Sequence, residues 1–488
     1  MMDNQKIPYI IAFLPILILI ILLSVNVIIF ENAIGGPNQI ALIFAGTIAS
    51  IVGIIYGCKW QKIIEGISNS IKSVVPAIIM LLLIGALSGT WLISGVIPTM
   101  IYYGLQILNP KIFLFATAII TAIVSLSTGS SWSTIATVGI ALLAIGTAMG
   151  LPIGLIGGSI ISGAYFGDKM SPLSETTNMA AAIGGVDLFD HIKYMMLTTI
   201  PSFLITIIIF LIIGFYFDTN ISSRQISQAT EVIANKFNIS IWLFLVPIFV
   251  IVMIIKKVSA IPALLFGTIL GAIFAIIFQP SIVIEISGMS SSNISSYYIG
   301  IVNSMIGDVN FNSVNTTIND IFNIAIADRS DLLKSGGMYG MLNTLLLIFS
   351  AMIFSGSIEA TGLLNRVAYP IVEYAKSTGS LIASTATTCI FFNLTTSDQY
   401  MSIVVPGRMY SKTYEEKELA SENLSRTLED SGTVTSVLIP WNSCGATQSA
   451  VLGVATLAYL PFCFFNLISP LMTIAYGYFG IKIKKLRK

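Results

Sequence analysis

Two stretches of the chain carry no charged residue over lengths that no ordinary buried helix reaches, Ile112 to Gly167 and Ser431 to Ile481. A helix needs about 20 apolar residues to cross the roughly 30 Å of hydrocarbon in a bilayer. Each stretch is therefore long enough for more than one crossing. Within a membrane, a helix satisfies its backbone hydrogen bonds inside one segment. The sequence therefore predicts an all-α polytopic membrane protein.

The composition excludes the soluble classes of protein. The chain is 55% hydrophobic and only 10% charged, whereas a soluble domain carries about 25% charged residues. A formal net charge of +1 provides no basic surface for nucleic acid. We therefore expect a lipid bilayer around the chain and no nucleic-acid partner. Because the single histidine, His191, and four separated cysteines form no metal-binding or disulfide pattern, we expect no cofactor.

Other uncharged runs bring the expected number of transmembrane helices to about ten to twelve. Basic residues in short loops favour the cytoplasmic side, so the tail Lys482–Lys488 is expected in the cytoplasm. The Ser- and Asn-rich stretch Ser281–Lys334 is expected on the opposite side. These runs are Pro8–Phe30, Ile40–Gly57, Val74–Leu108, Tyr194–Phe217, Asn238–Ile255, Val258–Ile284, Gly336–Ile358 and Ser377–Ser397.

Two of the apolar segments are interrupted by clusters of polar residues. Ser125–Thr137 reads SLSTGSSWSTIAT, and Phe391–Ser402 reads FFNLTTSDQYMS. A backbone group left unsatisfied in lipid costs several kcal/mol, so irregular backbone at membrane depth must be covered by protein or line a water-filled cavity. These segments therefore predict re-entrant hairpins or broken helices around a cavity.

The interruptions belong to a weak internal repeat. Duplicated halves with broken hydrophobic segments at matching positions are typical of secondary transporters. We expect the two halves to be inverted relative to each other. The matched segments are Ser88–Ile97 with Ser355–Leu364, Thr128–Ser131 with Thr395–Asp398, and Ser171–Glu175 with Ile439–Ser443.

The repeat divides the chain into four parts. Residues 1–59 are expected to hold N-terminal transmembrane helices, and residues 60–217 the first transport repeat. Residues 218–335 form a linker with two transmembrane helices and an extracytoplasmic loop. Residues 336–488 hold the second repeat and the basic cytoplasmic tail.

Four carboxylates near the breaks are candidate cation or proton sites: Asp168, Glu175, Asp398 and Asp430. Carboxylate, hydroxyl and carbonyl oxygens suit a small hard cation. A charged side chain at membrane depth is costly, so a carboxylate found there is expected to have a function. We expect Na⁺ at Asp168, Glu175 and Asp398. The alternatives are solvated charges in a loop leaving the membrane for the first two residues, an interfacial helix cap for Asp398, and an interfacial position for Asp430.

Hydroxyl, amide and small residues around the breaks are the candidates for lining the cavity or binding an organic substrate. Helix N-termini at the breaks are able to hold an anionic group. The alternative is that these residues form a packing face between membrane helices. They are Thr128, Gly129, Ser130, Ser131, Ser171, Thr176, Thr177, Asn178, Asn393, Thr395, Thr396, Ser397, Ser431, Thr433, Asn442, Ser443, Cys444 and Gly445.

Three segments, Ser162–Asn178, Ser397–Tyr410 and Thr427–Ala446, resemble the signature segments of the NhaC-type Na⁺/H⁺ antiporter family of the ion-transporter superfamily. The resemblance implies the bacterial inner membrane, two re-entrant hairpins, a scaffold around a transport core, and homodimers. It leaves the cargo open, because the family includes Na⁺/H⁺ exchangers, a malate/lactate exchanger and amino-acid carriers. Glu175 stands where the family often has Asp, and Ser443 where it often has Thr.

The main hypothesis is a secondary active transporter that exchanges Na⁺ and H⁺, its coupling ions, by alternating access. The alternative is a Na⁺- or H⁺-coupled carrier or exchanger of a small organic acid or amino acid. A channel or a membrane enzyme is a more distant alternative. A channel usually forms its pore by oligomeric symmetry, whereas here the halves repeat within one chain. No base and nucleophile stand together, so we expect no enzyme.

Overall fold

The computed structural model describes residues 7–30, 36–107, 109–216, 223–256, 258–322, 332–364, 366–367 and 376–486. Within these residues, the only named strands are β1 (Val309–Asn310) and β2 (Lys334–Ser335), which pair antiparallel. Everything else that is regular is helical, which confirms the predicted fold class. Arg487 and Lys488 of the predicted cytoplasmic tail lie outside the described residues.

Eight helices of the described part are long and apolar enough to cross a membrane, or up to ten if each of two bent helix pairs is one span. The upper number of spans, ten, equals the lower limit of the predicted ten to twelve transmembrane helices. Two further helices, α8 (Ile153–Met170) and α19 (Thr378–Thr396), have 18 and 19 residues but are not among these spans. Both contain many glycine, serine and threonine residues, which lower their apolar character.

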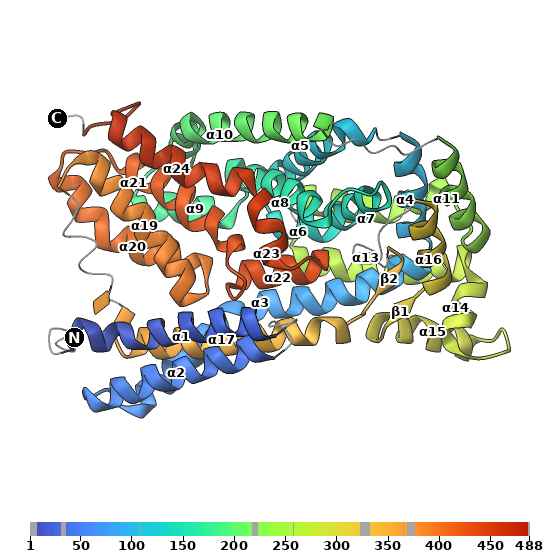
Figure 1. Ribbon diagram of the computed structural model, residues 1–488, viewed down its shortest axis with the longest axis horizontal. Helices are drawn as coiled ribbons and strands as arrows, with labels where there is room; N and C mark the ends of the chain where they lie inside the picture. Colours follow the sequence, from blue (N-terminus) through green and yellow to red (C-terminus); the bar gives the residue numbers. More distant parts are fainter. Residues whose placement is uncertain are drawn as a thin grey trace.

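Five long helices pack together as a scaffold. Helix α17 contacts both α2 and α3, α13 lies against α3, and α1 lies against α2. Figure 1 shows α1, α2, α3 and α17 side by side along the lower part of the molecule. The scaffold consists of α1 (Tyr9–Ile29), α2 (Pro37–Ile55), α3 (Trp60–Ile93), α13 (Ala260–Phe278) and α17 (Leu342–Ala360).

Most other helices of the two predicted repeats form the other half of the structure, whereas α3 and α17, which the predicted boundaries also include, pack in the scaffold. The first contains α5 (Pro110–Thr128), α6 (Ser131–Thr134), the π-helix η3 (Ile135–Gly139), α7 (Ile140–Ala148), α8, α9 (Glu175–Gly184) and α10 (Leu188–Tyr216). The second contains α19, α20 (Gln399–Glu416), α21 (Ser421–Leu428), the π-helix η7 (Glu429–Thr433), η8 (Ser436–Leu438), α22 (Ser443–Leu452), α23 (Thr456–Tyr459), η9 (Leu460–Phe462) and α24 (Phe464–Phe479).

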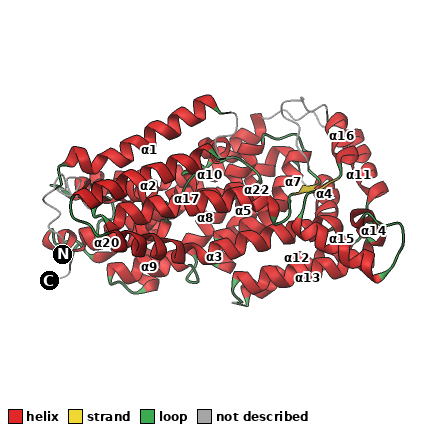
Figure 2. Cartoon of the chain, turned by 90° about the horizontal axis from the view of Figure 1, so that it is seen from below, coloured by secondary structure: helices red, strands yellow, loops and turns green. Residues whose placement is uncertain are grey.

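The remaining helices lie mostly at one end of the molecule. Figure 2 shows α4, α11, α14, α15 and α16 together at the end opposite the two termini. These elements are α4 (Val96–Ile107), α11 (Ser223–Lys236), η4 (Ile241–Phe244), α12 (Leu245–Ile255), α14 (Pro280–Ser287), α15 (Ile294–Ile306), α16 (Asn312–Ile321) and η6 (Tyr339–Met341).

The repeats match in structure, but the pairing at the first break shifts by one residue. Helix α5 ends at a left-handed Gly129, with φ 69°, and Ser130 caps the next helix. Helix α19 ends at a left-handed Ser397, with φ 58°, and Asp398 caps the next helix. The sequence comparison paired Gly129 with Thr396. This pairing was wrong because the feature that the two repeats share is the left-handed turn, which glycine forms easily and serine forms only with strain.

The second break confirms the shifted register. Ser174 caps α9 after Pro172, and Asn442 caps α22 after Pro440. In each repeat a side chain also ties the first broken helix to the second. The Ser125 hydroxyl donates to the Ala164 carbonyl at 2.6 Å. At the matching positions, the Asn393 amide donates to the Gly432 carbonyl at 2.6 Å.

The halves are inverted, as the sequence predicted. Helix α7 packs against α4, whereas α20 packs against α9 and α21. Figures 1 and 2 show α7 extending from the middle of the molecule towards the α4 and α11 end, and α20 extending towards the end where both termini lie. The two hairpins therefore enter from opposite ends, and their tips meet in the middle.

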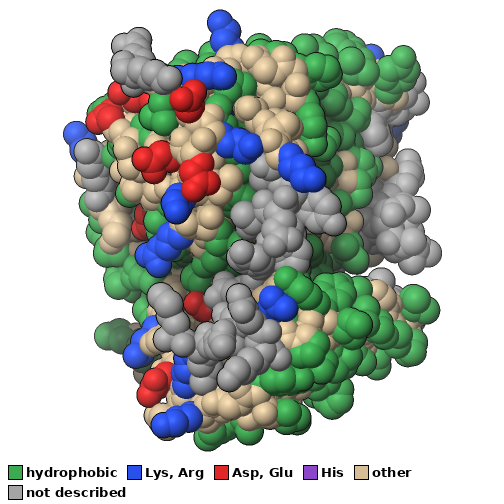
Figure 3. All heavy atoms as spheres, turned by 90° about the vertical axis from the view of Figure 1, so that its left-hand side faces the viewer, with side chains coloured by type: hydrophobic (Ala, Val, Ile, Leu, Met, Phe, Trp, Pro, Cys, Tyr) green, Lys and Arg blue, Asp and Glu red, His purple; other side chains and the backbone are tan. Residues whose placement is uncertain are grey.

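The surface agrees with a molecule surrounded by lipid. Large apolar side chains point outwards along the long helices, including Ile10, Ile28, Ile208 and Ile277. Soluble monomers rarely expose contiguous apolar patches of this kind. Figure 3 shows acidic and basic side chains gathered on the end that carries the termini, with green apolar surface around it. The membrane normal therefore runs along the long axis of the molecule in Figure 1.

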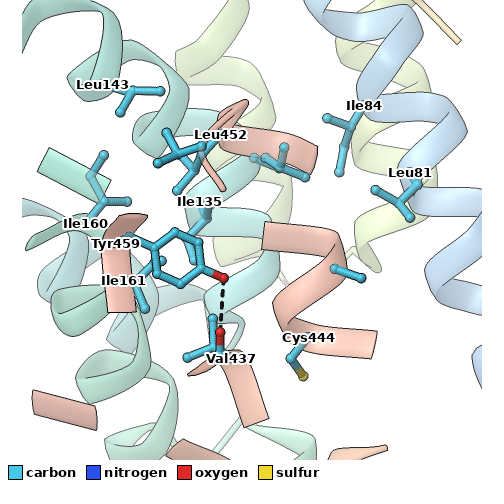
Figure 4. Packing of buried hydrophobic residues seen from close by; sticks show 14 of the residues in the cluster. Leu81, Ile84, Ile135, Leu143, Ile160, Ile161, Val437, Cys444, Leu452 and Tyr459 are labelled. Carbon is cyan, nitrogen blue, oxygen red and sulfur yellow. Dashed lines mark hydrogen bonds between the residues drawn. The ribbon is translucent and has the colours of Figure 1, made fainter. Parts of the chain in front are cut away.

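The core between the repeats is closely packed. Figure 4 shows Tyr459 of α23 beside Ile160 and Ile161 of α8, with Ile135 of η3 nearby. The Tyr459 hydroxyl donates to the Val437 carbonyl at 3.0 Å. This bond satisfies the one polar atom of a fully buried aromatic side chain, and it joins α23 to η8.

Replacing Gly163 by alanine is expected to destabilise the fold, because α8 touches α5 there. An added Cβ would lie 2.1 Å from the Ala118 carbonyl oxygen and 2.2 Å from the Thr121 hydroxyl. Overpacking of this kind costs about 1–3 kcal/mol. Thermal unfolding in detergent measures the loss. Gly340→Ala is the control, because its added Cβ would have no neighbour within 4 Å. Equal stability of the two variants would contradict the close contact.

Candidate functional site

A cavity of about 520 Å³ lies where the two hairpin tips meet. Both repeats line it, with Asp168 and the first break on one side and Asp398 and Ser443 on the other. The scaffold supplies a third wall through α3, from Ser73 to Met80. The polar interruptions of the two repeats therefore face a common space, as the sequence predicted.

Asp168 is held by the start of the helix that follows the first break. The Ser131 backbone N–H and hydroxyl both donate to the same carboxylate oxygen, at 3.0 and 2.7 Å. Ser131 is the first residue of α6, and free N–H groups at a helix N-terminus favour negative charge. The side chain is 8% exposed. The fold therefore presents a nearly buried carboxylate to the cavity in a fixed orientation.

Asp398 occupies the corresponding break of the second repeat. One carboxylate oxygen caps α20 by accepting the Tyr400 N–H at 2.6 Å. The other accepts the Ser73 hydroxyl of α3 at 3.2 Å. Asp398 does cap a helix, as the alternative reading of this residue held, but it does so beside the cavity and is only 3% exposed.

Glu175 lies at the exposed part of the cavity wall. It is the first residue of α9, and its carboxylate accepts the Tyr400 hydroxyl of α20 at 2.8 Å. This hydrogen bond joins the two repeats. The described residues contain no group of three His, Cys, Asp or Glu placed to hold one metal ion. Glu175, Asp168 and Asp398 therefore line one cavity, but the three do not converge as ligands of one metal ion.

Asp430 is separate from the cavity. It is fully buried and forms an ion pair with Lys169 of α8. Its second oxygen accepts the Thr198 hydroxyl at 2.8 Å. The sequence grouped Asp430 with the other carboxylates because it begins an uncharged run. The structure instead places it outside the cavity lining, where its ion pair with Lys169 ties η7 of the second repeat to α8 of the first.

Five of the predicted polar residues line the cavity, namely Thr128, Gly129, Ser130, Thr176 and Ser443. Others hold the breaks in shape. The Asn178 amide donates to the Pro172 carbonyl at 2.9 Å, and the Asn442 amide donates to the Asn393 carbonyl at 3.1 Å. The predicted residues outside the lining are Ser131, Ser171, Thr177, Asn178, Asn393, Thr395, Thr396, Ser397, Ser431, Thr433, Asn442, Cys444 and Gly445.

Several lining residues were not predicted. Ser73 lies on α3, where a single serine in a long helix gives no local signal. The apolar wall from α12 and α13, with Ile254, Val258 and Ile261, has the composition of ordinary membrane spans. The second repeat adds Gln399 beside Asp398. The sequence comparison paired Ser131 with Asp398, and only the register seen in the structure matches Ser131 with Gln399.

The electrostatic character of the cavity is acidic. Its described lining contains three carboxylates, Asp168, Glu175 and Asp398, and no Lys, Arg or His. Carboxylates nearly removed from water are stabilised by binding a cation or a proton. The arrangement is therefore suited to a positively charged cargo or to protons.

The chain is similar to known membrane antiporters. Residues 163–481 match the family model described as the Na⁺/H⁺ antiporter family. The Na⁺/H⁺ antiporter NhaC of Alkalihalophilus pseudofirmus is 36% identical over 447 residues, which cover 92% of the chain and 91% of that protein. The malate-2H⁺/Na⁺-lactate antiporter of Bacillus subtilis is 35% identical and covers 91% and 90%. The arginine/ornithine antiporter ArcD of Halobacterium salinarum is 33% identical and covers 97% and 92%.

Proposed function

Because the chain belongs to the Na⁺/H⁺ antiporter family, we propose that it exchanges Na⁺ for protons across the bacterial cytoplasmic membrane by alternating access. One observation carries the proposal. Asp168 and Asp398 come from inverted repeats and face one acidic cavity at the point where the helices are broken. Half-helix ends at the interface of two repeats are the usual place for ion sites in secondary transporters.

The exchange requires only that a carboxylate binds Na⁺ or a proton, but not both. Na⁺ takes carboxylate and hydroxyl oxygens as ligands, and Ser131 and Ser73 place hydroxyls beside Asp168 and Asp398. Each net charge that crosses the membrane is worth about 2.3 kcal/mol per 100 mV. If more protons than Na⁺ ions move per cycle, the membrane potential therefore drives Na⁺ export.

The proposed orientation follows from the charged end of the molecule. The tail meets the α20–α21 turn through a bridge between Leu419 and Lys485, and Lys484 pairs with Glu422. Basic residues gather on the cytoplasmic side of membrane proteins, so we assign this end and the C-terminus to the cytoplasm. We also propose that the protein forms the homodimer that the family resemblance implies.

A second candidate is the exchange of a small organic molecule, which the size of the cavity favours. A volume of about 520 Å³ exceeds the needs of a bare ion, and one wall is formed by apolar residues such as Ile254 and Val258. Relatives named for malate, lactate, arginine and ornithine have similar sequences. Three carboxylates would repel an organic anion, so an amino or guanidinium group suits this cavity better.

Reconstituted vesicles containing a pH dye distinguish the two candidates. Addition of external Na⁺ is expected to raise the internal pH, because Na⁺ enters as protons leave, whereas K⁺ is expected to have no effect. Radiolabelled ornithine, lactate and malate are offered to the same vesicles. Counterflow of one of these compounds without any Na⁺-driven pH change would replace the first candidate by the second.

Tyr400→Phe is expected to weaken apparent Na⁺ affinity about 2–10-fold. The variant removes the hydroxyl that joins α20 to Glu175, and one such hydrogen bond contributes about 0.5–1.5 kcal/mol. Na⁺ titration of the pH signal measures the change. Tyr298→Phe on the exposed side of α15 is the control. If both variants titrate like the unmodified protein, the Tyr400–Glu175 bond does not contribute to the site.

A further inference from the structure

Glu429 is a fully buried carboxylate outside the cavity. It begins the π-helix η7, and π-helical turns occur frequently at functional sites. Its oxygens accept the hydroxyls of Thr433 and Thr177, the latter at 3.2 Å. The ion pairs found among the described residues do not include it. An uncompensated buried carboxylate costs several kcal/mol, so this position requires a further source of neutralisation.

The nearest cation is already committed to another carboxylate. Lys169 and Asp168 of α8 interact electrostatically with Glu429, but the Lys169 ammonium is paired with Asp430. The Lys169 ammonium also donates to the Ser469 hydroxyl of α24 at 3.1 Å. Lys169 and Asp430 therefore neutralise each other, and Glu429 remains the surplus acid.

Other titratable groups around η7 do not supply the missing positive charge. Cys389 of α19 faces Glu429, and a thiol carries no positive charge. His191 of α10 faces the Lys169–Asp430 pair. Arg426, one turn earlier on α21, lies over the Tyr194 ring at 4.6 Å. On the side of η7 next to α20, the uncharged residues Ser402 and Ile403 lie against Gly432.

A layer of hydroxyls separates Glu429 from the cavity. The Thr177 hydroxyl lies 3.2 Å from the Glu429 carboxylate and 3.0 Å from the Lys169 carbonyl. Thr176 interacts with Glu429 and also lines the cavity together with Asp168. The Thr176 hydroxyl lies 3.1 Å from the Ser174 hydroxyl, and Ser174 in turn interacts with Asp168. Two hydroxyls, those of Ser174 and Thr176, therefore connect Asp168 at the cavity with Glu429.

We propose that Glu429 is a second proton-binding site, which exchanges protons with the cavity through the Thr176 and Ser174 hydroxyls. In this step, Na⁺ displaces the proton of Asp168 to cavity water, the O–H bond of protonated Glu429 then breaks, and the Thr176 and Ser174 hydroxyls pass its proton on to cavity water. No other atom is gained or lost. The site rests on the proposed function, and it allows more than one proton to move for each Na⁺ ion.

Glu429→Gln tests the proposal, because glutamine keeps the side chain's length but cannot bind the proton. We expect the purified variant to bind Na⁺ within about threefold of the unmodified protein, but to release fewer protons per Na⁺ and to show a flatter pH profile of exchange. Glu422→Gln, at the surface end of α21 beside Lys484, is the matched control and should leave both readouts unchanged. Unchanged proton release and an unchanged pH profile in Glu429→Gln would overturn the proposal.

Infrared difference spectroscopy tests the same site in the unmodified protein, should the Gln variant fail to fold. Protein labelled with carbon-13 glutamate is expected to show a protonated glutamate carboxyl band that responds to Na⁺ and disappears in Glu429→Asp. The absence of any glutamate band that responds would refute the site. If the vesicles show no Na⁺-driven pH change, the proposed function fails, whereas a glutamate band that titrates with pH and disappears in Glu429→Asp would still support Glu429.

Discussion

Asp398→Asn is expected to lower Na⁺-dependent proton exchange by at least about 30-fold. Removal of one partner from a buried charged interaction costs about 2–5 kcal/mol, and each 1.4 kcal/mol is a factor of ten. Asparagine also caps helices well, so α20 should keep its start and the protein its fold. The initial rate of internal pH change in vesicles at matched protein content measures the effect.

Asp187→Asn is the matched control for this substitution. Asp187 also accepts a backbone N–H at a helix start, that of Phe189 at 2.9 Å, but it is exposed and outside the cavity lining. Its variant is expected to transport at the normal rate. Normal exchange by Asp398→Asn would remove Asp398 from the transport site and leave it a helix cap.

Lys169→Met is expected to destabilise the protein by about 3–5 kcal/mol, because it leaves the Asp430 carboxylate buried without its cation. The double variant Lys169→Met with Asp430→Leu should regain most of the loss, since an apolar pair of similar size replaces the ion pair without a buried charge. Unfolding in mixed detergent, followed by tryptophan fluorescence, measures these differences.

Lys236→Met provides the comparison for the buried pair. Lys236 pairs with Glu285 at 2.7 Å, but both side chains are partly exposed, at 31% and 53%. Exposed pairs contribute about 0–1 kcal/mol. If Lys169→Met is no less stable than Lys236→Met, the buried pair does not stabilise the joint between the repeats.

The sequence predicted the parts of the structure that depend on local composition. Uncharged runs indicated membrane helices because lipid tolerates almost no charge. The polar interruptions at Thr128–Ser131 and Thr395–Asp398 indicated the breaks, because glycine and hydroxyl residues favour turns and helix caps. Asp398 was indicated by its own break and Asp168 by the dense polar segment that follows the first uncharged run, and both residues line the cavity.

The sequence did not predict contacts between distant segments. Ser73 reaches Asp398, and Tyr400 reaches Glu175, only because the inverted repeats fold against each other and against α3. The partner of Asp430 was missed for the same reason, since Lys169 lies far away in sequence. The shift of one residue in the repeat arose because a left-handed turn is a property of backbone conformation, which serine adopts in one half and glycine in the other.

Equilibrium binding of radiolabelled Na⁺ to the purified protein, with the released protons counted in the same sample, tests the shared acidic cavity most directly. Binding is expected to weaken as the pH falls, to release protons, and to disappear in both Asp168→Asn and Asp398→Asn. Na⁺ binding that releases no protons, or that survives unchanged in both variants, would contradict a site built jointly by the two repeats.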